Sequence, residues 1–359
     1  MNIKQAYQQQ IYAEWQHLAD YWYPLVEAKS LLNNTMIKIS AFNVNYLVWK
    51  NKQGETGVFL DTCCHKQAPL SEGRLQDNQL TCPYHGWQFD DQGNCVNIPY
   101  SDQPSNCANK SLLKIMSKNN NGIIWFFPGD QTLALNEEHN HVYKSWHSLT
   151  GDIVKMEEFA CDEQALIENF MDSPHTNFIH AGLIRKEKKL KPREIAIYLD
   201  EQQKLIVEHL PSDETLGPFN WLINPSKSPT HHQDMFIAPS QVDIQYQFEK
   251  EKTNFRTQII MCPIDKNRTR AFFKITCQFR LFNPLIRMGL KLFLPIILKQ
   301  DKKIVDLQFN NPAKLLQFKG EFIDYDLYSY QIKLLREQAK TQQASSGLIS
   351  SVHHTSLKL

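Results

Sequence analysis

The chain has almost no excess of either charge, because 39 Lys and Arg residues offset 38 Asp and Glu residues. A surface of this kind gives no indication of nucleic acid or of an acidic partner. Eight cysteines are too few for a disulfide scaffold in a chain of 359 residues. The first residues also lack the apolar core of a secretory signal peptide. These absences favour a reducing compartment, and we expect the cytoplasm.

No internal repeat and no flavin or dinucleotide fingerprint is visible in the sequence. The length leaves room for two domains, and 42% hydrophobic residues are enough to give each domain a core.

Two pairs of Cys and His are the strongest motif in the chain: Cys63 with His65 and, after sixteen intervening residues, Cys82 with His85. A Rieske [2Fe–2S] centre binds one iron through two thiolates and the other through two imidazoles, so each pair can give one ligand to each iron. A structural zinc site also takes two Cys and two His, but zinc fingers usually pair Cys with Cys and His with His. The mixed pairs therefore favour the iron–sulfur cluster.

With these ligands and the flanking residues 68–73 and 84–87, the chain resembles the oxygenase (alpha) component of the Rieske non-haem iron oxygenases. The likeness covers about residues 20–335. Cys64 stands where the family more often has Pro, and we take Cys63 as the ligand because it preserves the spacing.

A second set of potential metal ligands has the spacing D-x2-H-x4-H, formed by Asp172, His175 and His180. Two imidazoles and one carboxylate make the facial triad that binds mononuclear Fe(II) and leaves positions open. On a regular helix the two His would point about 140° apart and could not face one ion. Pro174 interrupts the helix and can redirect the residues that follow, and Gly182 is placed to end the segment.

The resemblance implies that the carboxylate ligand comes from far downstream, at the start of a helix. Asp301 fits this position, and Asp306 is the alternative. Asn169 and Asp172, with two residues between them, are similar to the arrangement in Rieske monooxygenases and demethylases rather than in ring dioxygenases.

By the same resemblance, Asp172 is a bridge for electron transfer rather than a ligand. It would link cluster ligand His85 of one subunit to His175 of the next through hydrogen bonds that fix both rings. A working site then requires an oligomer, and the family implies a homotrimer.

The fold class that we predict is α+β, with a small all-β Rieske domain and a catalytic domain in which an antiparallel sheet is flanked by helices. Strands are expected at 193–199, 204–209, 241–249, 255–262 and 270–280, and helices at 162–172 and near 284–310. The expected domains are an N-terminal helical segment packed on the catalytic domain (1–35), the Rieske domain (36–130), the catalytic domain (131–339) and a flexible tail (340–359).

Residues 281–298 are apolar enough to suggest a membrane, but their charges and prolines make them a poor transmembrane span. We expect a buried helix that covers the substrate pocket and delivers Asp301, with peripheral membrane contact as the alternative. Residues 230–234 contain two His and one Asp, and we interpret them as strand or pocket lining. His353 and His354 are expected in the flexible tail.

The resemblance predicts a terminal oxygenase with a [2Fe–2S] cluster, a mononuclear Fe(II) and O2 as co-substrate. Electrons from NAD(P)H would arrive through a ferredoxin, a flavin-containing reductase or both. The substrate would be a hydrophobic, cyclic small molecule, indicated by apolar residues near 219–222 and 285–298, and it would be hydroxylated or oxidatively demethylated. Desaturation or oxidative cyclisation could use the same iron.

Two alternatives from other classes stay open at this point. A Rieske electron-transfer protein without an oxygenase site would make His175, His180 and Asp301 incidental. A zinc-stabilised binding module would be colourless and would contain no acid-labile sulfide.

Overall fold

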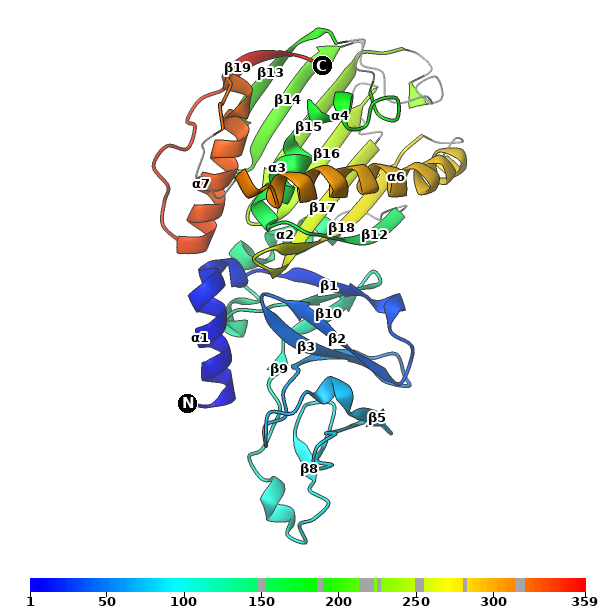
Figure 1. The fold of residues 1–359 in the computed structure, drawn as a ribbon, viewed down its shortest axis with the longest axis vertical. Helices are drawn as coiled ribbons and strands as arrows, with labels where there is room; N and C mark the ends of the chain where they lie inside the picture. Colours follow the sequence, from blue (N-terminus) through cyan, green and yellow to red (C-terminus); the bar gives the residue numbers. More distant parts are fainter. Residues whose placement is uncertain are drawn as a thin grey trace. The chain divides into compact units, whose positions relative to one another are not determined.

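The computed structural model describes residues 1–147, 151, 153–185, 190–212, 223–224, 227–248, 255–279, 283–313 and 320–359. The chain divides into two compact units (Figure 1). The first unit contains residues 1–143 and 262–265, and the second contains residues 144–261 and 266–359. One unit is built mainly from short strands and the other from a large antiparallel sheet with helices, so the predicted fold class is confirmed.

Three small antiparallel sheets make up most of the first unit, with strand orders β1-β11-β10, β2-β3-β4-β9 and β5-β6-β7-β8. Their strands are β1 (Tyr23–Glu27), β2 (Thr35–Ala41), β3 (Val44–Lys50), β4 (Thr56–Leu60), β5 (Arg74–Gln76), β6 (Gln79–Thr81), β7 (Gln88–Phe89), β8 (Cys95–Asn97), β9 (Lys114–Ile115), β10 (Ser117–Asn120) and β11 (Ile123–Phe126). Asp77 and Asn78 join β5 to β6, and both have the positive φ that a tight two-residue hairpin turn requires.

Helix α1 (Ile3–Trp15) belongs to the first unit, which corrects the prediction that residues 1–35 pack on the catalytic domain. Its Tyr7 hydroxyl donates to the carbonyl of Pro128 at 2.7 Å, and the Trp15 ring packs edge-on against Phe42. The composition of this segment correctly indicated a helix, but nothing in it indicated against which core the apolar face of the helix would pack. Helix α2 (Glu137–His147) crosses the boundary between the units at residue 143.

The second unit is organised around an eight-stranded sheet of order β12-β18-β17-β16-β15-β14-β13-β19. Its strands are β12 (Ile153–Phe159), β13 (Pro192–Leu199), β14 (Leu205–Ser212), β15 (Thr230–Ile237), β16 (Gln241–Gln247), β17 (Phe255–Asp265), β18 (Arg268–Cys277) and β19 (His353–Lys358). All five strands predicted between residues 193 and 280 are present, and residues 230–234 lie in a strand as expected.

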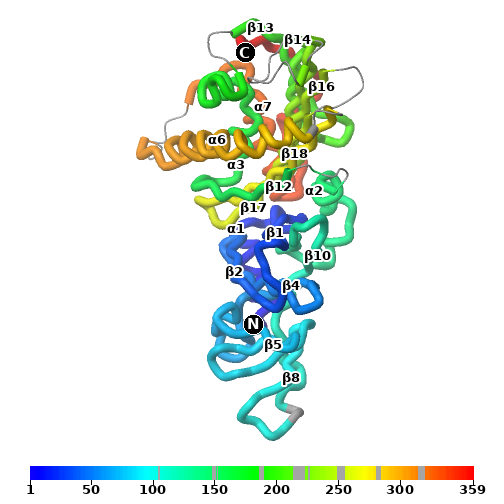
Figure 2. Tube along the Cα trace, turned by 90° about the vertical axis from the view of Figure 1, so that its right-hand side faces the viewer, coloured from blue at the N-terminus to red at the C-terminus, as the bar shows by residue number. Residues whose placement is uncertain are grey.

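The helices of the second unit are α3 (Glu163–Met171), α4 (His175–Phe178), α6 (Asn283–Phe309) and α7 (Leu327–Thr341). Helices α3, α6 and α7 lie on one face of the sheet, as the edge-on view in Figure 2 shows. Leu166, Ile167 and Met171 of α3 are fully buried in the core beneath them. A buried ion pair between Glu163 and Arg336, 2.6 Å long, fastens α7 to α3.

The prediction of a flexible tail over residues 340–359 is wrong, because residues 353–358 form β19 along the edge of β13. The backbone of Leu359 also exchanges two hydrogen bonds of 2.9 Å with Lys191, and its side chain is buried. The Ser, Gln and Thr content suggested disorder. In the structure, half-buried and exposed side chains alternate along the strand, as expected of a strand, but the polar composition of the segment does not reveal this alternation.

Helix α6 is half-buried rather than fully covered. Ile286, Leu294 and Leu298 pack into the core, whereas an outer stripe is exposed, formed by Leu285, Met288, Leu292 and Ile296. Within the described residues, no helix is long and apolar enough to cross a membrane. Residues 219–222 and 281–282, part of the predicted pocket and helix, lie outside the described residues.

Candidate metal centres

The two His of the second motif converge because a proline divides the segment into two short helices. Helix α3 ends at Met171, and Asp172 follows in an extended conformation. Pro174 cannot supply the N–H that would continue the helix, and a new turn, α4, starts at His175. As a result, the rings of His175 and His180 lie 5.2 Å apart, centre to centre. This is the convergence for which the sequence analysis required a break.

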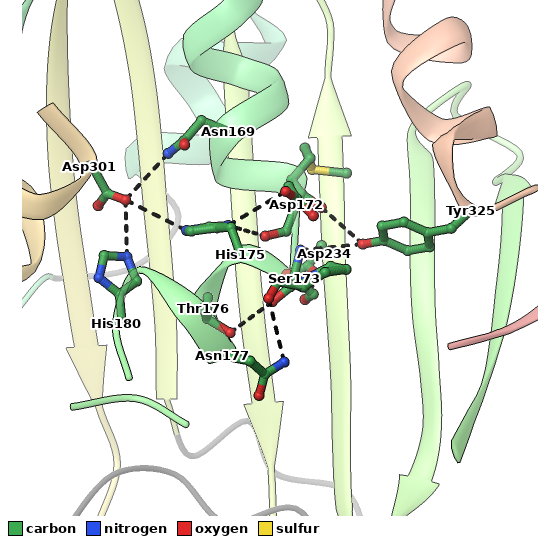
Figure 3. A network of polar contacts seen from close by, with 12 residues as sticks. Asn169, Asp172, Ser173, His175, Thr176, Asn177, His180, Asp234, Asp301 and Tyr325 are labelled. Atoms are coloured by element: carbon green, nitrogen blue, oxygen red, sulfur yellow. Dashed lines mark hydrogen bonds and ion pairs between the residues drawn. The ribbon is translucent and has the colours of Figure 1, made fainter. Parts of the chain in front are cut away.

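Asp301 completes the cluster from the interior of helix α6 rather than from the start of a helix, as the resemblance had implied. Its Oδ1 atom lies 3.0 Å from Nε2 of His180 and 3.6 Å from Nε2 of His175, and its side chain is almost fully buried (Figure 3). Asp306, the alternative, is exposed and accepts a hydrogen bond from Asn310. The structure therefore brings Asp301, and not Asp306, to the two imidazoles.

Hydrogen bonds on the far side of each ring orient the nitrogen that faces Asp301. Nδ1 of His180 lies 2.9 Å from Oε1 of Gln300, and Nδ1 of His175 contacts the backbone carbonyl of Asp172. Both contacts require Nδ1 to donate, which leaves the Nε2 lone pair of each ring for a metal. Two imidazole nitrogens and one carboxylate oxygen, oriented in this way, fit the facial triad of non-haem iron(II).

Asp301 and His175 each stabilise the charged form of the other. Burial alone would raise the pKa of Asp301, but contacts with His175 and His180 outweigh it and hold the pKa below its usual value. Burial alone would lower the pKa of His175, and its contacts with Asp301 and Asp172 raise it instead. Burial raises the pKa of Asp172 to about 6. A carboxylate buried among imidazoles is thus stabilised by positive charge, which a divalent cation supplies more strongly than a protonated ring.

Asn169, the other residue singled out beside Asp172, points toward the same carboxylate. Its Nδ2 atom lies 3.5 Å from Oδ1 of Asp301, a long contact that helps to orient the oxygen. Figure 3 shows Asn169 and His180 approaching Asp301 from different sides.

The two Cys and His pairs lie in two similar loops of the first unit, one after β4 and one between β6 and β7. The amide of Cys63 donates to the carbonyl of Ala68, and the amide of Cys82 donates to the carbonyl of Trp87, both at 2.9 Å. Gly86 has φ +71°, a conformation that favours glycine and closes the second loop. Both thiol-bearing residues are buried.

The two His of these loops lie side by side. The rings of His65 and His85 are 4.8 Å apart, and Trp87 stacks on His65 at 4.5 Å with an angle of 8° between the planes. Nδ1 of His65 is buried and has no hydrogen-bond partner among the described residues. Burial of a ring nitrogen that has no hydrogen-bond partner costs free energy unless the nitrogen binds another group. The iron of a [2Fe–2S] cluster is such a group. The donor set of two thiols and two imidazoles fits that cluster.

A buried polar network behind the second site was not found from the sequence. Oδ2 of Asp234 accepts from the hydroxyl of Ser173 at 2.9 Å and lies 3.3 Å from Nε2 of His209, while Oδ1 lies 2.8 Å from Nε2 of His232. The rings of His209 and His232 stack 4.3 Å apart. His232 and Asp234 belong to the stretch noted at residues 230–234, but His209 was not singled out, and nothing indicated that Ser173, two residues before His175, would reach them.

Arg185 supports the same segment from another direction. Its Nη1 atom donates to the carbonyl of Ser173 at 2.8 Å and to Oγ1 of Thr176 at 2.9 Å, and its Nη2 atom lies 3.4 Å from Nδ1 of His232. The amide of Ser173 also donates to the hydroxyl of Tyr325 at 3.3 Å. The turn that carries His175 is therefore held by several buried polar contacts.

Comparison with known proteins identifies both units. Residues 21–116 match the model of the Rieske [2Fe–2S] domain, and residues 159–322 match the vanillate O-demethylase oxygenase C-terminal domain. The chain is 27% identical over 178 residues to chlorophyllide a oxygenase of Arabidopsis thaliana, covering 47% of this chain and 30% of that protein. It is 31% identical over 140 residues to the oxygenase component of dicamba O-demethylase from Stenotrophomonas maltophilia, covering 37% and 39%.

The fold is similar to that of dicamba monooxygenase in complex with 3,6-dichlorosalicylic acid, with a TM-score of 0.73, 19% identity, and coverage of 91% of this chain and 98% of the other. The sequence matches span about a third of the length of the first curated relatives. The order of the two matched domains, a Rieske domain followed by an oxygenase C-terminal domain, shows that the chain belongs to the Rieske non-haem iron oxygenases, in the group that contains monooxygenases and demethylases.

Proposed function

We propose that the chain is the terminal oxygenase of a multicomponent Rieske system. In this role it uses O2 and electrons from NAD(P)H, delivered by a separate reductase, to hydroxylate or oxidatively demethylate a small molecule. The observation that carries the proposal is the convergence of His175, His180 and Asp301 in a chain that also contains the two Rieske loops. A simple electron carrier has no need for the second set of ligands.

When bound, the two iron groups supply the redox chemistry, with one-electron transfer at the cluster and O2 activation at the mononuclear site. His175, His180 and Asp301 would hold the mononuclear iron through two imidazole nitrogens and one carboxylate oxygen. Gln300 fixes the ring of His180, and the Asp172 carbonyl fixes that of His175. The protein therefore contributes orientation, and no additional acid or base is required.

Asp172 supports a proposal about assembly. One of its carboxylate oxygens lies 4.0 Å from Nδ1 of His175, and 35% of its side chain is exposed. Its carboxylate can therefore accept a hydrogen bond from outside the chain, while its backbone carbonyl contacts His175. We assign that donor to His85 of a neighbouring subunit in a homotrimer, which would connect cluster and iron through Asp172. Light scattering should give three times the chain mass.

The substrate and partners are proposed from chemistry that the relatives share. Chlorophyllide, dicamba and ketosteroid are all cyclic, which supports a hydrophobic ring compound as the substrate here. A ferredoxin, a flavin-containing reductase or both would supply electrons. The cytoplasm suits the reduced thiols, although the plant relatives are chloroplastic. The exposed apolar stripe of α6 would be covered by a neighbouring subunit in the assembly. Binding of the protein to lipid vesicles would instead favour peripheral membrane contact.

Iron and acid-labile sulfide per chain, measured on protein purified without oxygen, test the proposal. We expect about three irons and two sulfides, with a Rieske-type electron paramagnetic resonance signal after dithionite. His175→Ala should lose one iron and keep the signal, and Asp306→Ala should keep all three. Two irons in the wild type, with no further Fe(II) taken up and no loss in His175→Ala, would establish an electron carrier. Absence of sulfide would indicate zinc.

A further inference from the structure

Two cysteines outside the cluster loops lie almost within bonding distance. The Sγ atoms of Cys95, at the start of β8, and Cys107, at the end of a short 3-10 helix (Pro104–Cys107), are 2.9 Å apart. A disulfide requires about 2.0 Å between sulfurs. The two side chains would have to move by only about 1 Å to form one.

We propose that Cys95 and Cys107 form a reversible disulfide that fastens the loop between them beside the Rieske histidines. Forming the bond breaks two S–H bonds and releases two electrons and two protons. A small-molecule disulfide, such as oxidised glutathione, accepts both electrons and leaves as two thiols. A dithiol reductant reverses the reaction by the same exchange.

The two thiols are suited to different steps of this exchange. Cys107 is half-buried, so an external disulfide can reach its sulfur, whereas Cys95 is buried. Burial and the adjacent Cys107 raise the pKa of Cys95 to about 12, which keeps it protonated and unreactive toward solvent. Cys107 therefore attacks the external disulfide as its thiolate and releases the first thiol. Cys107 is then an uncharged mixed disulfide, so Cys95, already in contact, loses its proton to solvent and displaces the second thiol.

The loop that this bond would close contacts the cluster histidines through one tyrosine. Tyr100 accepts a hydrogen bond of 2.7 Å from the indole of Trp87, and Trp87 stacks on His65. The ring of Tyr100 also lies 6.4 Å from that of His85 in an edge-on arrangement. A covalent tie at the base of the loop limits how far Tyr100 can move away from these rings.

The residues that follow Cys107 in the sequence also lie beside the cluster ligand His65. Residues 109–113 follow it and line a hollow of about 570 Å³, whose wall also includes Cys64, His65 and Trp87. Hydrogen bonds already present at the base include those from the amide of Cys95 to the carbonyl of Lys110 and from the amide of Lys110 to the carbonyl of Cys107. The disulfide would add a covalent connection to a region now joined by hydrogen bonds.

The test uses the full-length protein with both metal sites loaded, incubated without oxygen with oxidised glutathione. We expect a mass loss of two hydrogens per chain, one cross-linked peptide containing Cys95 and Cys107, an unchanged Rieske resonance signal, and reversal by dithiothreitol. Amide hydrogen exchange in residues 98–103 should slow about tenfold. Cys107→Ser should abolish all of these effects, and Cys277→Ser, at a buried thiol of the other unit, should abolish none.

Two results would overturn the proposal. A stable adduct of one glutathione on Cys107, or no reaction at all, would show that the sulfurs cannot bond. A disulfide that forms without slowing exchange in the loop would show that the bond does not fasten it. Because neither readout involves turnover, the outcome is independent of the proposed oxygenase activity.

Discussion

Acidification should lower the stability of the second unit through one buried imidazole, that of His209. The ring is almost fully buried, and Nε2 faces the carboxylate of Asp234, whereas Nδ1 has no partner among the described residues. Burial and the stacked His232 lower the pKa of His209 from 6.5 to about 4, and Arg185 adds to this effect. The Asp234 carboxylate opposes the shift without overcoming it. The folded protein therefore keeps this ring neutral at pH values at which the unfolded chain protonates it.

The sign and size of the effect follow from this difference. Between pH 6.5 and pH 4 the unfolded state binds one more proton at His209 than the folded state, so stability falls as the pH falls. Each pH unit in this window costs about 1.4 kcal/mol, or about 3 kcal/mol over the whole window. Above pH 6.5 the contribution is fully present. Between pH 7 and pH 5.5 we expect a loss of about 1.4 kcal/mol from this residue alone.

The assay is urea unfolding at pH 7 and pH 5.5, followed by hydrogen exchange in peptides from β14 and β15, so that the second unit is observed separately. His209→Gln should reduce the pH dependence by about 1.4 kcal/mol, because Gln can still donate to Asp234 but does not titrate. His231→Gln is the matched control, since this neighbouring ring is partly exposed and paired with Glu208. An equal pH dependence in His209→Gln and wild type would refute the reasoning.

Three further perturbations have defined outcomes. Asp234→Asn should destabilise the second unit by about 3–5 kcal/mol in urea, because an amide cannot accept from all the donors around this carboxylate. Deleting residues 348–359 should lower the thermal midpoint and promote aggregation, because it exposes the edge of β13. Gly73→Ala should destabilise the first unit by more than about 2 kcal/mol and reduce its sulfide content, because a Cβ atom there would lie 2.1 Å from the carbonyl of Thr81.

The sequence predicted the features that local spacing determines. The two Cys and His pairs each lie within four residues, so their loops could be inferred before the sheets around them were known. The break at Pro174 is equally local, and it correctly indicated that His175 and His180 point the same way. Asp301 lies 121 residues from His180, and only the resemblance to a family connected the two.

Contacts between segments that are far apart in the sequence could not be predicted from it. Ser173 and Asp234 are 61 residues apart, and neither belongs to a motif that would pair them. Gln300 stands directly before Asp301, yet its contact with His180 depends on where α6 crosses the sheet. The C-terminal strand was missed for a different reason, because the polar composition of the segment was interpreted as disorder.

The proposed iron ligands His175 and Asp301 are positioned by different contacts, and this separates their expected responses to mutation. His175 is held by the turn at Ser173, which Asp234 of β15 and Arg185, from the segment after α4, both contact. Asp301 is positioned by α6, where the adjacent Lys302 forms an ion pair with Glu157 of β12.

Lys302→Met keeps most of the side-chain length and removes the charge. It should therefore release the part of α6 that carries Asp301 from β12, without changing the turn at Ser173. We expect weaker Fe(II) binding at the mononuclear site, by about tenfold, as is common when an outer partner of a ligand is lost. The Rieske signal should be unchanged, because the cluster loops belong to the other unit. Lys303→Met, at an exposed position one residue further, is the control. If Lys302→Met binds Fe(II) as tightly as Lys303→Met, the position of Asp301 depends on the packing of α6 rather than on this ion pair.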